Sequence, residues 1–71
     1  MDRNAKEYYA DRILVFINRR GQIRVKDVAS WLYLNKDRTR RLLDWMVSVG
    51  YITKKTIKYA GNANMNVYFK K

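Results

Sequence analysis

The segment from Asn35 to Gly50 reads as a helix with both of its ends marked in the sequence. Asparagine is a preferred N-cap residue, and glycine suits the position just after a helix C-terminus. Between them, the apolar spacing of residues 36–49 places one face toward a core: Thr39, Leu42, Leu43, Met46 and Val49. The fold must therefore supply other elements that cover this face.

The first turns of this helix carry an excess of positive charge. The four cations within six positions are Lys36, Arg38, Arg40 and Arg41. They repel one another there, and the helix dipole disfavours cations near an N-terminus. The chain has a net charge of +10, and residues 52–71 contain five lysines and no acid. This distribution predicts a polyanionic partner that contacts the C-terminal part most strongly.

Two helices and a short strand are predicted before Asn35. Residues 4–18 show the i, i+4, i+7, i+8 spacing of a buried helix face, at Tyr9, Ile13, Phe16 and Ile17. Residues 22–25 alternate as in a strand, with Ile23 and Val25 inward. Residues 26–34 read as a second helix with Val28, Ala29 and Leu32 inward.

Residues 51–70 predict a β-hairpin. Both arms are rich in β-branched and aromatic residues, and the turn residues of 61–64 lie between them. The short strand 22–25 can pair with this hairpin. The expected fold is a single α+β domain over residues 1–71, in the order helix, short strand, helix, helix, strand, strand.

A family resemblance is carried by the segment "IRVKDVASWLYLNKDRTRRLLDWMVSVGYI". It resembles the helix-turn-helix of winged-helix DNA-binding domains, among them small stand-alone regulators of archaea, their viruses and plasmids. The matching residues are Ile23, Val25, Val28, Ala29, Leu32, Asn35, Thr39, Arg41, Leu43, Met46, Gly50, Tyr51 and Ile52. Tyr33 departs from the family pattern, because the turn at this position often has glycine.

The resemblance implies a transcriptional regulator that binds double-stranded DNA sequence-specifically. Helix 36–49 would lie in the major groove, and the hairpin 51–70 would contact the backbone or the adjacent minor groove. Outward arginines can pair with guanine, and Asp44 can accept from cytosine N4. The expected DNA-binding residues are Asn35, Lys36, Asp37, Arg38, Arg40, Arg41, Asp44, Lys54, Lys55, Lys58, Asn62 and Asn64.

Several alternatives remain open from the sequence. The i, i+4 pairs Asp37–Arg41 and Arg40–Asp44 would also stabilise a merely solvated helix. Lysines in a hairpin also protect an edge strand from aggregation. A winged helix can instead serve RNA or single strands in replication or translation, or bind only protein. Left-handed duplex recognition fits less well, because such domains carry Asn and Tyr where Arg40 and Asp44 stand.

Four aromatic or apolar residues fall beside the inward stripes of the helices, and they are Tyr8, Val15, Trp31 and Trp45. They predict a homodimer interface, which would suit a pseudo-palindromic DNA site. Alternatively, amphipathic aromatic residues extend a small core. A further interpretation is that Trp or Tyr rings stack on bases, as they do in proteins that bind single strands.

Several residue types are absent from the sequence, and their absence limits the classes of function that we expect. There is no histidine, no cysteine and no glycine-rich phosphate loop, so we expect neither an enzyme nor a metal or cofactor site. No apolar run is long enough to span a bilayer, and the N-terminus lacks the apolar stretch of a secretion signal. We therefore expect a cytoplasmic, nucleoid-associated protein without membrane contact.

Overall fold

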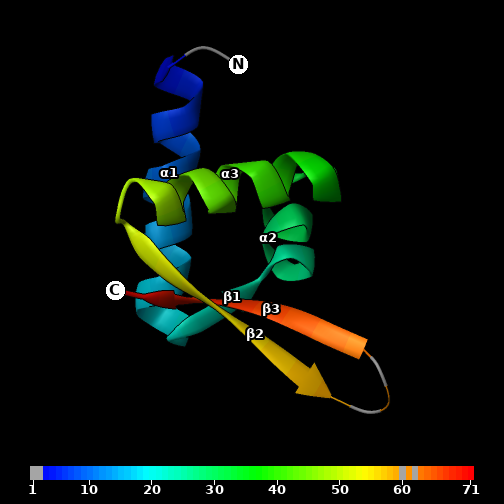
Figure 1. Cartoon of the computed structure of the whole chain (residues 1–71). Coiled ribbons are helices and arrows are strands. Elements are labelled where there is room, and N and C mark those ends of the chain that lie inside the picture. The colour runs from blue at the N-terminus through cyan, green and yellow to red at the C-terminus, as the bar shows by residue number, and fades with distance from the viewer. Residues whose placement is uncertain (1–2, 60, 62) are drawn as a thin grey trace.

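The described part of the chain contains three helices and three strands, in the order α, β, α, α, β, β. The computed structural model describes residues 3–59, 61 and 63–71. The elements are α1 (Arg3–Arg20), β1 (Gln22–Arg24), α2 (Val25–Leu32), α3 (Lys36–Ser48), β2 (Ile52–Tyr59) and β3 (Ala63–Lys70) (Figure 1). The predicted α+β class and the predicted order of elements are confirmed.

The strands form an antiparallel sheet in the order β1-β3-β2. β2 and β3 pair along their whole length, from Ile52 opposite Lys70 to Tyr59 opposite Ala63. β1 pairs only with residues 67–69 of β3. The outer half of the hairpin therefore projects beyond β1 as a two-stranded ribbon, which runs away from the helices in Figure 1.

The core lies between the three helices and the inner half of the sheet. Its buried side chains are Ala10, Ile13, Ile17, Ile23, Val28, Leu42, Leu43, Met46, Ile52 and Tyr68. Thr39 is also fully buried, and its hydroxyl donates to the carbonyl oxygen of Asn35 at 2.8 Å. The polar group at the core edge is thus satisfied, as burial requires.

The predicted end-marking residues of α3, Asn35 and Gly50, are confirmed, although the helix ends at Ser48 and not at residue 49. Asn35 Oδ1 accepts from the backbone N–H of Arg38 at 2.7 Å, which satisfies one of the unpaired amides of the first turn. Gly50 has a φ of +86°, and the next amide, that of Tyr51, donates to Met46 O at 2.9 Å. This is the left-handed C′ geometry for which glycine is suited.

The predicted element boundaries need small corrections. Helix 4–18 extends over Arg3–Arg20, strand 22–25 ends at Arg24, and helix 26–34 covers Val25–Leu32. Val25 is therefore the first residue of α2 and not an inward strand residue, although it packs partly against the core. Tyr9 and Phe16 are likewise only partly buried, at the edge of the core.

The placement of Val49 in the buried face is wrong. Its side chain is 46% exposed. α3 ends at Ser48, and Val49 is the C-cap residue with φ −91° and ψ 1°. Because its backbone has left the helix, the helical spacing that placed it inward no longer applies.

None of the helices within the described part of the chain combines the length and the apolar character needed to cross a membrane.

Candidate nucleic-acid interface

The cations of α3 separate onto two sides of the helix. Arg38 and Arg41 line a depression of about 620 Å³ on the side of α1. Lys36 and Arg40 line another, of about 440 Å³, on the side of the hairpin. All four residues are exposed. The four predicted cations therefore lie on one helix, but they do not form a single patch.

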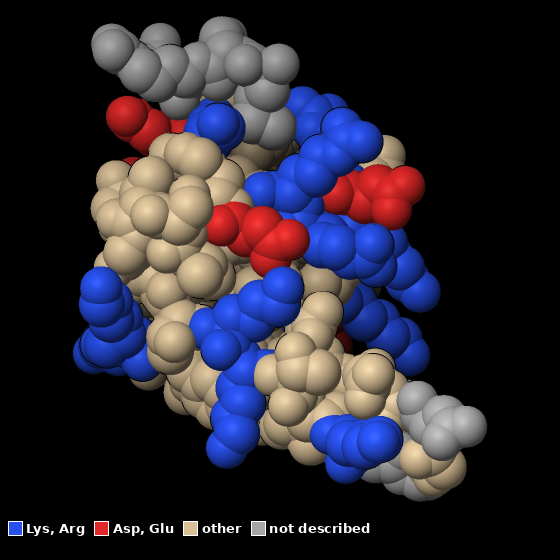
Figure 2. Space-filling view, in the orientation of Figure 1, with Lys and Arg blue, Asp and Glu red and all other residues tan. Residues whose placement is uncertain are grey.

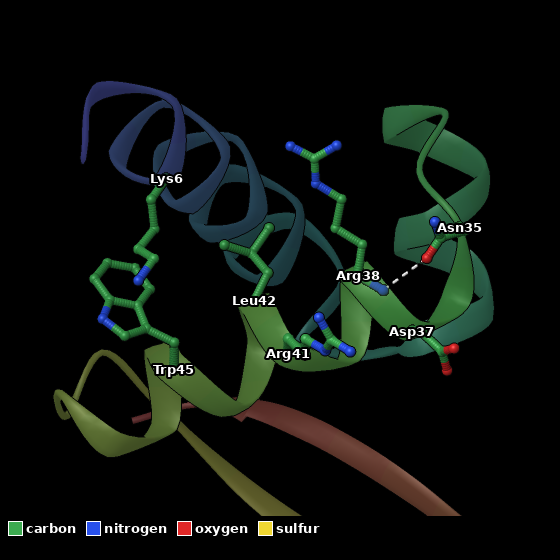
Figure 3. Close-up of a pocket in the computed structure, with 7 residues that line it drawn as sticks. All are labelled: Lys6, Asn35, Asp37, Arg38, Arg41, Leu42 and Trp45. Atoms are coloured by element: carbon green, nitrogen blue, oxygen red, sulfur yellow. Dashed lines mark hydrogen bonds between the residues drawn. The ribbon is translucent and has the colours of Figure 1, made fainter. Parts of the chain in front are cut away.

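The depression beside α1 combines three cations and the carboxylate of Asp37 with an aromatic ring (Figure 3). Lys6 reaches from α1 to place its Nζ 4.7 Å from the centre of the Trp45 ring, close enough for a cation–π contact. Leu42 points toward α1 from the same helix that carries Arg38 and Arg41. A third cation, from a different element, thus joins the two arginines.

Among the described residues, the depression beside the hairpin is lined by four cations and no acid. They are Arg24, Lys26, Lys36 and Arg40, and the other lining residues are Val25, Asn64, Met65 and Asn66. The site forms where β1 has ended, so that residues 64–66 of β3 face the beginnings of α2 and α3. Opposing phosphates would relieve the repulsion among these cations.

The sequence-based prediction missed Arg24 and Lys26. The signal was present as two cations flanking Val25, at the junction of a strand and a helix. What the sequence did not show is that this junction lies beside the start of α3. Arg24 is held in place by Asp27 at 3.7 Å, and its Nη1 donates to Met65 Sδ at 3.2 Å.

Asp44 is engaged inside the molecule. Its Oδ1 accepts a hydrogen bond from the Tyr68 hydroxyl at 2.9 Å, and Lys54 Nζ lies 3.4 Å from the same oxygen. The Asp44 side chain is 44% exposed, so it still has access to solvent. Contacts with the sheet therefore fix the position of Asp44. The prediction that Asp44 contacts a cytosine did not include these contacts.

Burial raises the pKa of the Tyr68 hydroxyl well above its usual value. The hydrogen bond to the Asp44 carboxylate and the negative charge of that carboxylate raise this pKa further, whereas the charge of Arg40 lowers it. The Tyr68 hydroxyl therefore remains protonated, and so remains a donor, throughout the neutral pH range.

The ion pairs of α3 differ from those expected. Asp37 lies 3.8 Å from Arg40, at i, i+3, and Asp44 pairs with Lys54 of β2. The Arg40 and Asp37 side chains are 54% and 82% exposed, so this pair contributes little to stability. Neither predicted i, i+4 pair, Asp37–Arg41 or Arg40–Asp44, is among the described ion pairs.

The strand register divides the predicted hairpin residues between two faces. Lys54 is opposite Tyr68 and Lys58 is opposite Asn64, and these four share the face that points toward α3. Lys55 is opposite Val67 and lies on the other face. Asn62 lies outside the described residues. Only part of the predicted set can therefore meet the same ligand as α3.

Positive side chains cover much of the face that carries α3 and the hairpin. Figure 2 shows them gathered around the beginning of α3 at the upper right and along the hairpin at the lower edge. Acidic side chains interrupt this surface as separate spots. Across residues 3–59, 61 and 63–71, no three Asp, Glu, His or Cys side chains come together in a way that could hold a metal ion.

Both tryptophans among the four predicted dimer residues have ring partners within the chain. Trp31 lies 4.4 Å from Phe16, between centroids, with the Arg20 guanidinium 4.7 Å from its ring. Trp45 meets Lys6 and Tyr51, and both tryptophans are partly buried against the core.

The other two predicted dimer residues are solvent-exposed. Tyr8 is 57% exposed and Val15 is 49% exposed, and both belong to α1. This face of α1 is therefore the part of the predicted interface that remains available to another chain.

Comparison with protein-family models, with curated proteins and with solved structures finds no match to this chain.

Proposed function

We propose that this chain is a winged-helix protein that binds double-stranded DNA sequence-specifically. In this proposal α3 enters the major groove, and the β2–β3 hairpin lies against the backbone or the adjacent minor groove. The observation that carries it is the pair of cation-lined depressions on the two sides of α3. They combine side chains from α1, α2, α3 and the end of β1.

The arrangement suits a groove bounded by two phosphate strands. An α-helix with its side chains is about 10–12 Å across, which matches the width of the major groove. A helix in that groove has one strand of phosphates on each side. Arg38 with Lys6 would face one strand, and Lys36 with Arg40 would face the other.

Arg41 is the residue that we assign to a base. It follows Asp37 by four positions and precedes Asp44 by three, so it lies on the outward line of α3 between two carboxylates. Its exposed guanidinium has the geometry for bidentate pairing with guanine O6 and N7. Asp44 would then act chiefly by holding the hairpin in a fixed orientation relative to α3.

Regulation of transcription is the role that we propose for this binding. It rests on the likeness of residues 23–52 to winged-helix regulators. A homodimer through the outward face of α1 would present two copies of α3 to a two-fold-symmetric site.

The decisive experiment measures duplex affinity against salt concentration by fluorescence anisotropy, with the duplex taken from a selection of random sequences. We expect log K to fall linearly with log salt, and duplex to outcompete single-stranded DNA and RNA of the same sequence. An affinity that is insensitive to salt, or a preference for single strands, would overturn the proposal.

A matched pair of variants tests the assignment of Arg41. Arg41→Ala should weaken binding to the selected duplex by about tenfold or more and relax the preference at one base pair, because one bidentate contact is lost. Arg19→Ala is the control, since it removes an exposed arginine from the last turn of α1. Equal losses in the two variants would exclude Arg41 as the base contact.

A further inference from the structure

Tyr33 combines two properties that a side chain in a small domain seldom combines. Its backbone is left-handed, with φ 56° and ψ 42°, and among the described residues it is the one non-glycine with positive φ. Its side chain is also 95% exposed. The first property is sterically unfavourable for a residue with a Cβ atom, and the second means that burial of the ring does not offset it.

The turn requires the backbone conformation but not the tyrosine. Tyr33 is the C-cap of α2, and its amide and that of Leu34 both donate to the carbonyl oxygen of Ala29. A left-handed residue at this point closes the helix and lets the chain reverse toward α3. Glycine would adopt the same conformation with no steric cost, as it does at Gly50 after α3.

The ring of Tyr33 also differs from the other described tyrosine rings. Tyr68 is buried and bonded to Asp44, and Tyr51 contacts Trp45. Tyr8 packs on Tyr9 and lies near Arg12. Within the described part of the chain, Tyr33 enters no such ring contact. The side chain is therefore not explained by the fold.

The position of the turn indicates what the ring could meet. Tyr33 is two residues before Asn35, which lines the depression beside α1, and three before Lys36, which lines the depression beside the hairpin. Three residues span at most about 11 Å of chain. The exposed residue Tyr33 thus lies just before the N-terminal end of α3, within three residues of both depressions.

We propose that Tyr33 is a contact residue for the sugar–phosphate backbone of the DNA, with its hydroxyl donating to a phosphate oxygen and its ring covering a deoxyribose. The inference rests on the proposed function. Tyrosine is among the side chains that bond DNA phosphates, and its two rotatable bonds make a large contact area available at low entropic cost. The surrounding positive charge complements the same ligand.

Two substitutions that tolerate a left-handed backbone test this role. Tyr33→Gly and Tyr33→Asn both remove the ring, and the first also removes the steric cost. We expect both variants to fold, with a melting temperature for Tyr33→Gly equal to or above that of the wild type. We expect both to bind duplex DNA about threefold to tenfold more weakly, the size of effect that one lost hydrogen bond and its contact produce. Tyr33→Phe should fall between them and the wild type.

The sequence dependence of the loss identifies the backbone as the partner. A backbone contact lowers affinity equally for the selected duplex and for an unrelated duplex, whereas a base contact lowers it only for the former. A loss confined to the selected sequence would overturn the backbone assignment. Wild-type affinity in both Tyr33→Gly and Tyr33→Asn would overturn the inference while leaving the proposed function intact. Absence of duplex binding by the wild type would overturn both.

Discussion

The hydroxyl of Tyr68 donates to Asp44 Oδ1 over 2.9 Å and thereby ties the central strand of the sheet to α3. Lys54 approaches the same carboxylate oxygen from β2, at 3.4 Å. One atom therefore joins α3 to both strands of the hairpin. If α3 and the hairpin act on one ligand, this junction holds them in their relative orientation.

Removal of the Tyr68 hydroxyl should destabilise the protein modestly. We expect Tyr68→Phe to lower the free energy of unfolding by about 1 kcal/mol, the typical net value of one hydrogen bond, because the half-exposed Asp44 can recruit water in its place. Urea denaturation monitored by circular dichroism measures this change. Tyr51→Phe removes a hydroxyl from an exposed tyrosine and should have no effect. Equal stability of the two variants would contradict a contribution from the Tyr68–Asp44 bond.

The raised pKa of the Tyr68 hydroxyl predicts that the protein loses stability at alkaline pH. The pKa of Tyr68 in the folded protein is raised above the value of about 10 of an unfolded chain. Above that pH the unfolded state releases the proton first, so the free energy of unfolding falls by up to about 1.4 kcal/mol per pH unit. Below about pH 10 the contribution of the Tyr68 hydroxyl to the free energy of unfolding is fully present. Unfolding of the wild type and of Tyr68→Phe should be compared between pH 8 and pH 12, and parallel curves would show that Tyr68 is not the group responsible.

Lys58 and Lys55 form a matched pair for the hairpin. Lys58 shares the sheet face of Tyr68, and Lys55 lies on the opposite face. We expect Lys58→Ala to weaken duplex binding and to reduce the slope of log K against log salt by about 0.9, the value for one phosphate contact. Lys55→Ala should change the slope by much less. A reversed order of effects would mean that the hairpin presents its other face to the DNA.

The exposed face of α1 predicts self-association. Val15→Glu places a charge at a site that is already 49% exposed, so the fold should survive. We expect sedimentation equilibrium to give a dimer for the wild type and a monomer for Val15→Glu, with the same circular dichroism spectrum. A monomeric wild type at concentrations well above those of DNA binding would refute the dimer.

The sequence was a good guide to α3 because each of its signals is local. The cap at Asn35, the stop at Gly50 and the inward stripe all depend on neighbours within four residues, and the structure confirms them except at Val49. Val49 fails because helical spacing says nothing about where the backbone leaves the helix. The strand–helix junction at Val25 was misplaced by one residue for a similar reason.

The candidate interface was less predictable because it depends on contacts between distant segments. Asp44 was expected to contact a cytosine or to pair with Arg40 four residues away, but its partners within the chain come from 10 and 24 residues away. The faces of Lys55 and Lys58 depend on the register of β2 against β3, which a run of lysines does not reveal. Arg24 and Lys26 reach the interface only because the end of β1 brings them beside α3.

The cations of α1 that lie over the two indoles make each tryptophan an optical probe of a different part of the molecule. Arg20 covers Trp31 at the seam between α1 and α2, whereas Lys6 covers Trp45 beside Arg38 and Arg41. A polyanion arriving at those two arginines would compete for the ammonium group of Lys6 and alter the emission of Trp45, while the emission of Trp31 stayed constant. Ligand engagement on that side of α3 can therefore be followed without any attached dye.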